Sequence, residues 1–320
     1  CPSHLNCQTC EIQSIADSVN LDSLRVHVRC LADDTTFSLG DESYRIAGRY
    51  DSTGRKVARL YLKTKLDAYG LVTRLDTFGV ATNYSIADVN VLAEQPGTLE
   101  PDVTVIIGAH YDALVGGQTI APGADGNASG VATVLEVARV MSHYSTRHTI
   151  VYALWDACER GRLGSTSYAT KARARGDSIR AVLNVIMTGW DSVQTSQGEI
   201  WVRAFAQSQG LGDSLLALSR DVNTGITMSV FNPVLVGSDH VSFWQQGYNA
   251  VSITGKYMEG NRSPYVGTVN DRVAHMNFQS FLGRARFSAA ATAYLADGGQ
   301  VMAAVPLHAM PTSASLSQNY

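Results

Sequence analysis

The sequence lacks both a strong excess of charge and any long apolar run. Its 25 lysines and arginines nearly balance its 28 aspartates and glutamates, so the formal net charge is −3. A chain this close to neutrality has no general electrostatic attraction for nucleic acid or for an anionic membrane surface. No apolar run approaches the ~18 residues that a membrane-spanning helix requires. We therefore expect no nucleic-acid partner and no membrane span.

The N-terminus lacks the basic and apolar stretch of a signal peptide, and the chain starts at a cysteine. A chain that starts in this way is expected to have been processed, so we interpret the sequence as a mature form. A lipid on the N-terminal cysteine is compatible with this interpretation. The Asn-x-Ser sequences at Asn83 and Asn261 fit the glycosylation acceptor pattern. We predict a protein that is secreted, extracellular or held at the cell surface.

Cysteine is scarce and unevenly placed. Four of the five cysteines crowd the N-terminus, and the fifth, Cys158, stands alone. Four clustered cysteines in an exported chain favour two disulfides, with three possible pairings. A metal knuckle through the Cys7 and Cys10 pair is the competing interpretation. We predict a cysteine-rich leader over residues 1–22, tied by disulfides among Cys1, Cys7, Cys10 and Cys30.

Short apolar runs alternate with amphipathic stretches along most of the chain. Runs of this kind, bounded by polar residues, are typical of buried strands in a parallel sheet. They cover residues 103–108, 149–155, 181–187 and 250–254, with further strands predicted at 71–77, 87–93 and 200–205. Helices are predicted at 23–31, 55–70, 131–143, 165–174, 210–220 and 278–297. This alternation predicts an α/β three-layer sandwich, with helices on both faces of a mostly parallel central sheet. The domain is predicted to span residues 23–297, followed by a tail at 298–320.

Polar residues follow several of the predicted strands. His110 comes directly after the first buried run, Asp125 lies in the long loop that follows, and Glu159 comes after the next buried run. Ligands of open α/β sheets bind beyond the carboxyl ends of the strands, so we expect these three side chains to converge on one sheet edge. One histidine with two carboxylates is a ligand set suited to zinc.

Six separated motifs occur in an order and at spacings that make a family resemblance specific. They are His-Tyr-Asp at 110–112, PGADGNASG at 122–130, ERGRLGS at 159–165, NVIMTG at 184–189, SDHVSF at 238–243 and TVND at 268–271. Together they resemble the co-catalytic di-zinc aminopeptidases. That family also includes the glutamate carboxypeptidases, the transferrin-receptor-like domains and the glutaminyl cyclases. The resemblance covers residues 23 to 295 and implies a zinc-exopeptidase fold.

The resemblance implies roles for four residues that match the family's motifs. His110 stands where the family has a ligand of one zinc, and Asp112 stands where the family orients that histidine. Asp125 matches the aspartate that bridges both zincs, and Glu159 matches a ligand of the second zinc. The resemblance therefore implies that His110, Asp125 and Glu159 are the remnant of a zinc site.

The chain departs from the family at five other functional positions. Cys158 replaces the glutamate that serves as general base, and Val266 replaces the tyrosine that donates to the oxyanion. A third ligand of the first zinc is lost at Ile186, and a ligand of the second zinc is lost at Gly267. Gly126 replaces the second aspartate of the family's Ala-Asp-Asp motif.

Each zinc site is thus left with two protein ligands, whereas a catalytic zinc needs about three plus a water. A missing general base alone costs roughly 10²–10⁴ in rate. We therefore expect no tightly bound cofactor, with zinc implied only by the resemblance. We expect a pseudoenzyme with an extracellular binding, structural or self-assembling role.

Three alternatives remain open from the sequence. Asp191 is an alternative ligand if the motif around Ile186 is misaligned. Cys158 is a candidate nucleophile if His110 or His240 lowers the pKa of its thiol. The chain as a whole is alternatively an active secreted metallo-aminopeptidase with an atypical metal site.

Overall fold

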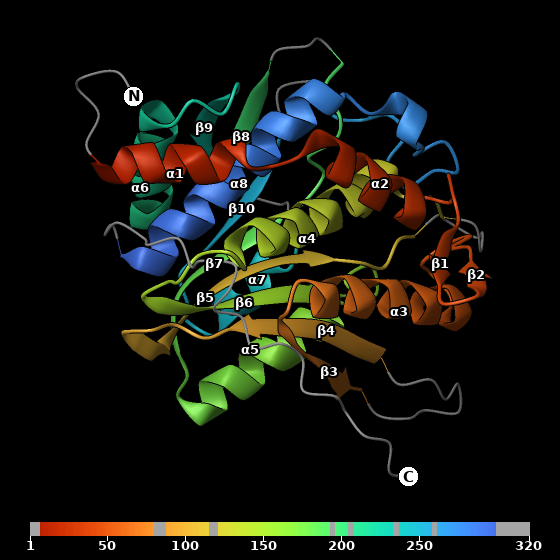
Figure 1. Ribbon diagram of the computed structural model, residues 1–320, viewed down its shortest axis with the longest axis horizontal. Helices are drawn as coiled ribbons and strands as arrows, with labels where there is room; N and C mark the ends of the chain where they lie inside the picture. Colours follow the sequence, from red (N-terminus) through yellow and green to blue (C-terminus); the bar gives the residue numbers. More distant parts are fainter. Residues whose placement is uncertain are drawn as a thin grey trace.

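The computed structural model describes residues 7–79, 88–114, 121–192, 196–203, 208–232, 237–257 and 261–298. Within these residues an eight-stranded mixed sheet forms the centre of the fold (Figure 1). The strands run from edge to edge in the order β3, β4, β6, β5, β7, β10, β8, β9. Their bounds are β3 (Val72–Phe78), β4 (Asp88–Gln95), β5 (Glu100–His110), β6 (His148–Trp155), β7 (Ser178–Val185), β8 (Gln197–Trp201), β9 (Thr227–Phe231) and β10 (Ala250–Gly255).

The four inner strands β6, β5, β7 and β10 are parallel neighbours. Towards one edge, β4 runs antiparallel to both β6 and β3. Towards the other edge, β8 runs antiparallel to β10 and parallel to β9. The parallel strands coincide with the uniformly apolar runs of the sequence, because a parallel strand in this fold is covered on both faces.

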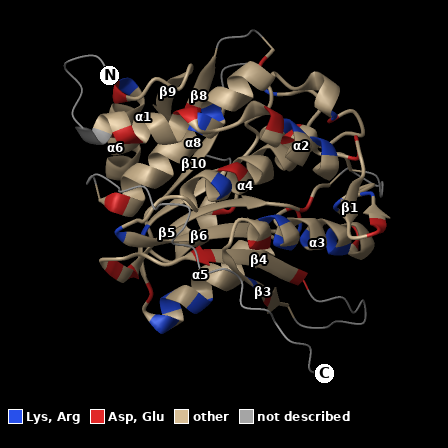
Figure 2. Ribbon diagram, in the orientation of Figure 1, with Lys and Arg blue, Asp and Glu red and all other residues tan. Residues whose placement is uncertain are grey.

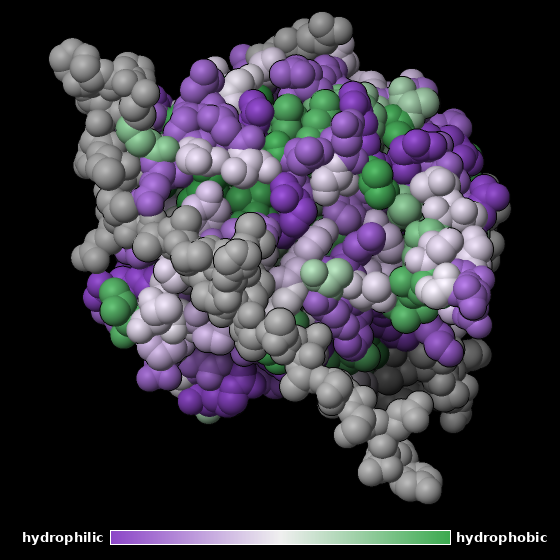
Figure 3. Space-filling model, in the orientation of Figure 1, coloured by the Kyte–Doolittle hydropathy of each residue, from purple (hydrophilic) through white to green (hydrophobic). Residues whose placement is uncertain are grey.

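Helices cover both faces of the sheet. One face packs against α1 (Cys7–Asp17), α2 (Leu21–Leu31), α3 (Ser52–Ala68), α4 (Ser129–Met141), α6 (Ser208–Asp221) and α8 (Phe278–Asp297). The other face packs against α5 (Leu163–Arg175) and α7 (His240–Gln245). The predicted α/β three-layer sandwich is therefore confirmed. In the view of Figure 3 the outer surface is mostly polar, with apolar patches near the start of α8.

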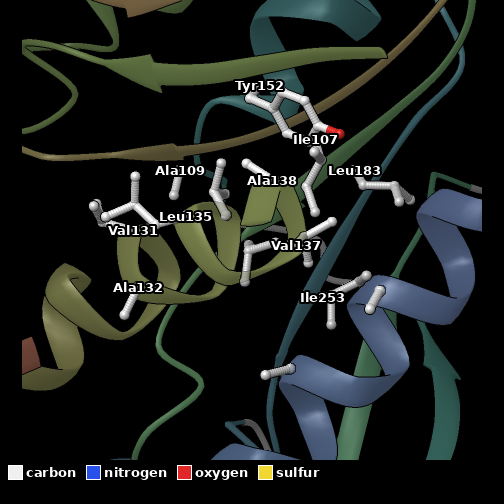
Figure 4. Packing of buried hydrophobic residues seen from close by; sticks show 14 of the residues in the cluster. Ile107, Ala109, Val131, Ala132, Leu135, Val137, Ala138, Tyr152, Leu183 and Ile253 are labelled. Atoms are coloured by element: carbon white, nitrogen blue, oxygen red, sulfur yellow. The ribbon is translucent and has the colours of Figure 1, made fainter. Parts of the chain in front are cut away.

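The larger core lies between α4, α8 and the inner strands. Figure 4 shows Leu135 and Ala138 of α4 beside Ala109 and Ile107 of β5, all of them inaccessible to solvent. Each fully buried leucine or isoleucine contributes roughly 1.5–3 kcal/mol to folding. The core therefore holds the carboxyl ends of the central strands, and the loops that follow them, in fixed positions.

Helix α1 lies within the segment predicted as a leader. Its side chains Ile12, Ile15 and Ala16 are buried in the same core as α4 and α8. This part of residues 1–22 thus packs as a helix of the domain. Among the described residues no helix is both long enough and apolar enough to cross a membrane.

The prediction that Cys30 belongs to a disulfide is wrong. Cys30 is a free cysteine that lies on the inward face of α2 with Leu24, Val28 and Leu31. Its side chain lies in the core for that reason, beside Tyr61 of α3. Cys10 is disulfide-bonded. Cys1 and the side chain of Cys7 lie outside the described residues, so the pairing within the leader stays a prediction.

The glycosylation pattern at Asn261 does not mark an accessible acceptor. Asn261 is 6% exposed, and its amide is hydrogen-bonded to Ser192 and Asp191. Asn83 lies outside the described residues.

Sequence patterns did not predict α7, β9, or the small hairpin of β1 (Phe37–Leu39) and β2 (Glu42–Tyr44). These elements are short, and β1, β2 and β9 have no run of buried apolar residues.

A buried histidine joins α2 to α3 and to the turn after it. His27 is 3% exposed, with Nδ1 2.7 Å from the Tyr61 hydroxyl and Nε2 3.2 Å from the Tyr69 hydroxyl. Burial lowers the pKa of His27 to about 3, and the charges of Lys65 and Arg139 lower it further in the same direction. The folded protein therefore holds this imidazole neutral in a pH range where the unfolded chain protonates it.

We expect His27 to make the protein less stable as the pH falls from about 6.5 towards 3. The unfolded state binds one more proton than the native state there, so the free energy of unfolding falls by up to about 1.4 kcal/mol per pH unit. The variant His27→Gln keeps a hydrogen-bonding side chain without the titration and should lose that part of the slope. The free energy of unfolding is measured by urea denaturation at pH values from about 4 to 8, which covers the range in which His27 is expected to act. The exposed His143→Gln is the matched control, and an equal change in slope for both variants would contradict the assignment.

Candidate functional site

The predicted site residues lie where the parallel strands end. His110 is the last residue of β5, and Glu159 and Ile186 follow the ends of β6 and β7. Asp125 lies in the turn that precedes α4. Because β5 pairs in parallel with both β6 and β7, their carboxyl ends meet at one edge of the sheet. The loops that carry the site therefore start from this edge.

Asp112 holds one half of the site together. Its carboxylate lies 3.3 Å from His110 Nδ1, and its carbonyl oxygen lies 3.1 Å from the same nitrogen. The two carboxylate oxygens also accept hydrogen bonds from the backbone N–H groups of Cys158 and Glu159, each at 3.0 Å. Asp112 thereby fixes the histidine and the loop after β6 relative to each other. This contact agrees with the orienting role that the resemblance implies for Asp112.

Asp271 holds the other half of the site. Its two carboxylate oxygens accept hydrogen bonds from the backbone N–H groups of Asp125 and Gly126, both at 2.9 Å. The Asp125 side chain in turn accepts from the N–H groups of Gly189, at 2.7 Å, and Trp190, at 3.2 Å. Burial raises the pKa of Asp125, and the neighbouring charge of Asp271 raises it further. One oxygen of the predicted bridging ligand is therefore engaged by backbone donors.

Asp239 is a site residue to which the sequence analysis assigned no role, although it lies in the SDHVSF motif. It is fully buried, accepts a hydrogen bond of 2.6 Å from the Ser165 hydroxyl, and acts electrostatically on His110. Burial alone would lower the pKa of His110. The hydrogen bond with Asp112 and the charges of Asp112, Asp239 and Glu159 outweigh burial and raise this pKa to about 9. The imidazole is therefore surrounded by acidic groups.

Cys158 is partly exposed, and its Sγ lies 3.8 Å from the Ser238 hydroxyl. Burial of the thiol raises its pKa well above the usual value, and the charges of Asp239, Asp112 and Glu159 raise it further. A nucleophilic cysteine needs the opposite environment, with nearby positive charge that stabilises the thiolate. His240 is buried, and its Nδ1 lies 3.4 Å from the Asn184 amide. The geometry therefore does not support Cys158 as a nucleophile.

Arg49 links the loops of both halves, and nothing in the sequence pattern pointed to it. Its guanidinium is inaccessible to solvent and donates to the carbonyls of Tyr111, at 2.7 Å, Pro122, at 2.8 Å, and Gly123, at 2.9 Å. It also donates to the carbonyl of Leu31 at the end of α2. The charges of Asp271 and Asp112 act on the guanidinium from nearby. Arg49 thus connects α2, the loop of Asp112 and the loop of Asp125.

Comparison with known proteins identifies the family. The model of peptidase family M28 matches residues 90–292, well over half of the chain. The chain belongs to peptidase family M28. It is 26% identical over 313 residues to leucine aminopeptidase 1 of Paracoccidioides brasiliensis, a match that covers 90% of this chain and 74% of that protein. The match to leucine aminopeptidase 1 of Emericella nidulans spans 55% of that relative's length.

Solved structures agree with the fold. The LapA aminopeptidase of Legionella pneumophila superposes with a TM-score of 0.74 at 17% identity, covering 91% of this chain and 75% of that one. A zinc aminopeptidase of Bacillus subtilis superposes with a TM-score of 0.71 at 14% identity, covering 86% of this chain and 95% of that one. At these identities the likeness establishes the fold.

The donor set of this M28 chain does not fit the zinc that the family implies. Among the described residues no group of three or more His, Cys, Asp and Glu side chains is arranged to hold a metal ion. The two positions predicted to have lost a ligand offer none, since Ile186 is a buried hydrocarbon and Gly267 has no side chain. The glycine at 126 also leaves room for Val266, because a Cβ at that position would lie only 3.2 Å from Val266 Cγ1, closer than ordinary van der Waals contact. No catalytic step through a metal is derived for this chain.

Asp191 does not take the place of the ligand lost at Ile186. Its carboxylate accepts a hydrogen bond of 2.6 Å from the Ser280 hydroxyl and one of 3.1 Å from the Ser196 backbone N–H. It also accepts a bond of 3.2 Å from the Asn261 amide and lies 3.7 Å from Arg284. Asp191 therefore belongs to the contacts that hold the start of α8.

Replacing Arg49 by methionine should lower the free energy of unfolding by about 3 to 5 kcal/mol, because four buried carbonyls lose their donor. Urea unfolding followed by circular dichroism measures this. Arg45→Met is the matched control, since the side chain of Arg45 is 63% exposed and its ion pair joins only Asp33. The control should leave the free energy of unfolding nearly unchanged, because an exposed ion pair contributes little. Equal losses for both variants would show that Arg49 does not hold the loops.

Cys158 should react slowly with iodoacetamide in the folded protein at pH 8, because its raised pKa keeps the thiol protonated. We expect alkylation at least about tenfold slower than that of an unhindered thiol. Mass spectrometry of labelled peptides measures this rate, with urea-unfolded protein as the reference for full reactivity. Buried Cys30 is an internal control that should react only after unfolding. Rapid and selective labelling of Cys158 would revive the nucleophile hypothesis.

Proposed function

We propose that this M28-family protein does not hydrolyse peptides and instead acts outside the cell as a binding, structural or self-assembling protein. One observation carries the proposal. The contacts that hold the site loops are present, whereas the groups that would do the chemistry are replaced. Asp112, Asp271 and Arg49 make the contacts to backbone groups and to His110 described above. Cys158, Ile186 and Gly267, in contrast, occupy positions that the resemblance assigns to a base and two ligands.

His110, Asp125 and Glu159 are the residues that would hold metal if any were bound. A bound zinc would polarise a substrate carbonyl and acidify a water. The chain provides neither a carboxylate at position 158 to take the proton of that water nor a hydroxyl at position 266 to donate to the developing oxyanion. Losing the base costs roughly 10²–10⁴ in rate, and losing an oxyanion donor costs about 10²–10³.

The remaining space beside Asp125 also supports the proposal. The cavity that Asp125 lines with Met187, Trp190 and Tyr257 has a volume of about 10 Å³. Pockets that bind small molecules usually measure roughly 300–1,000 Å³. This cavity between described residues is therefore too small to hold a substrate side chain.

The replaced positions are mutually consistent. Several carboxylates gathered without a metal repel each other and lose solvation energy. Glycine at 126, cysteine at 158 and isoleucine at 186 remove three of them. The charges of Arg49 and Arg284 act on the carboxylates that remain, on Asp271 and on Asp125. The protein's own cations thus offset part of the repulsion among these carboxylates.

A second candidate function is an active metallo-aminopeptidase with an atypical site. It is favoured by the retention of His110, Asp125 and Glu159, and by similarity to proteins named leucine aminopeptidase and zinc aminopeptidase. This candidate requires a bound metal and EDTA-sensitive turnover.

Metal analysis combined with an activity assay separates the two candidates. After dialysis against zinc and then against buffer, we expect far less than one zinc per chain by plasma mass spectrometry, because each zinc is left with two protein ligands. We expect no turnover of leucine p-nitroanilide above the blank. The Bacillus subtilis zinc aminopeptidase is the positive control. Two zincs per chain with EDTA-sensitive turnover would overturn the proposal.

A back-substituted variant makes the same test sharper. Gly126→Asp, Cys158→Glu, Ile186→Asp, Val266→Tyr and Gly267→His together restore the family's residues and should gain zinc binding. The matched control carries Cys158→Gln in place of Cys158→Glu, so it should bind zinc without turnover. Some loss of stability is expected at Gly267, whose φ of +77° disfavours a side chain. Activity already present in the unaltered chain would contradict the assignment of these positions.

The extracellular location and the partners are also part of the proposal. The disulfide bond of Cys10 is typical of proteins in oxidising compartments. A lipid on the N-terminal cysteine, other protein partners and self-association are all compatible with this location.

A further inference from the structure

Helix α3 has a second apolar stripe besides the one that it buries. Its inward face carries Ala58, Leu62 and Leu66, which are inaccessible to solvent. Val57 and Leu60 lie on a different side of the helix, and Leu60 is 39% exposed. An amphipathic surface helix usually has a single apolar stripe facing the core. Of this second stripe, Val57 is partly buried against the core, whereas Leu60 stays largely uncovered by the described part of the domain.

This stripe borders a groove at the edge of the sheet. Figure 1 shows α3 next to β3 and β4, and β3 is an edge strand with β4 as its only neighbour among the described strands. Leu75 of β3 is 51% exposed and lines the groove opposite Leu60, with Val57 and Tyr44 beside them. The groove has a volume of about 610 Å³. The groove thus has an apolar floor and lies next to the free edge of β3, whose outward backbone N–H and C=O groups have no partner among the described strands.

The rim of the groove is positively charged. Lys56, Arg59 and Lys63 line it, and no aspartate or glutamate does. Figure 2 shows lysines and arginines along α3. Arg59 lies 3.8 Å from Asp156 and Lys63 lies 2.5 Å from Asp67, whereas Lys56 makes no ion pair with any described residue. The groove therefore favours an occupant that carries both apolar side chains and carboxylates.

We propose that the groove between α3 and β3 binds an extended peptide segment of another protein, whose side chains towards α3 include both apolar and acidic residues. Such a segment pairs its backbone with the free edge of β3, as in strand addition. Because side chains alternate along a strand, every second one points to the α3 face. There the apolar side chains cover Leu60 and Leu75, and the carboxylates reach Lys56 and Lys63.

Two other occupants fit the observations less well. A symmetric contact with a second copy would place Lys56 and Lys63 against the same lysines of that copy, which is electrostatically unfavourable. The chain's own segment 299–320 contains no aspartate or glutamate, so it does not complement the lysines. The proposal does not depend on whether the candidate site binds zinc, since the groove lies on α3 and β3 and contains none of the candidate site residues.

The test uses a fluorescein-labelled peptide as long as the seven residues of β3, and fluorescence anisotropy with the whole chain. In this peptide leucine and glutamate take turns at every second position, with threonine between them, so that both face α3. We expect saturable binding with a Kd of about 10–100 µM that weakens as salt is added. Leu75→Asp and Lys56→Glu should each weaken binding about tenfold or more. The matched control is Leu99→Asp, which alters a leucine that is 65% exposed outside the groove and should leave binding unchanged. Circular dichroism and thermal melting confirm that each variant is folded.

Control peptides distinguish the proposed mode from its competitors. A peptide with lysine in place of glutamate, and one with a central proline, should bind at least about tenfold more weakly if charge and strand pairing both contribute. No saturable binding, or equal binding by the groove variants, would overturn the proposal. So would displacement of the peptide by dodecanoate at equal affinity, which would indicate an acyl-chain site. A wild-type dimer in sedimentation that Leu75→Asp abolishes would assign the groove to a second copy of the chain instead.

Discussion

The buried guanidinium group of Arg49 is the interaction on which the geometry of the candidate site depends. It donates to four backbone carbonyls, in α2, in the loop after β5 and in the turn before α4. A buried cation that water does not reach is stable only if all of its N–H groups are hydrogen-bonded and anions lie near it. Asp112 and Asp271 provide that charge. The same two carboxylates hold the backbone at 125–126 and 158–159, so one network of buried charges positions both halves of the site.

This network explains how an M28 fold keeps its site loops in place without the family's full ligand set. In a metallopeptidase the zinc ions draw the carboxylates together and neutralise them. Here the contacts run instead from carboxylates to backbone N–H groups and from arginine to carbonyls. The loops consequently keep their positions at the carboxyl ends of β5, β6 and β7. Loss of the catalytic groups and retention of the fold are compatible for this physical reason.

The proposed peptide groove lies on a different part of the fold from the candidate site. The sheet edge at β3 and the outward stripe of α3 combine exposed leucines, unpaired backbone and lysines. None of these features is constrained by the packing of the core. A rigid sheet edge is therefore available to a partner independently of what the candidate site does.

Much of the fold was predictable from local sequence. The apolar runs that became β5, β6, β7 and β10 are buried on both faces, so their composition alone distinguishes them from surface strands. Helix α8 was predicted with its observed bounds, because Asn277 caps its start through two backbone N–H groups and Gly298 ends it in the left-handed region. By contrast, β9 and the β1–β2 hairpin are short and half-exposed, and their pairing depends on neighbours that no local pattern reveals.

Other outcomes depended on which way a side chain faces in the folded chain. Cys30 was predicted in a disulfide from its proximity in sequence to other cysteines, yet helix α2 turns it into the core. Asn261 matches an acceptor pattern, yet it is buried against Asp191.

The sequence by itself determined the order of most elements and the family's motifs, because each of these is local or follows from residue type. The identity of the replaced catalytic residues stays a prediction from the resemblance. Only the tertiary structure decided that Arg49, Asp239 and Asp271 support the site, that Asp191 does not, and that α3 and β3 form a charged apolar groove. Those assignments depend on contacts between residues far apart in the chain, such as Arg49 with Gly123 and Asp271 with Asp125. Such contacts arise from the packing of the whole domain and have no signature in any one segment.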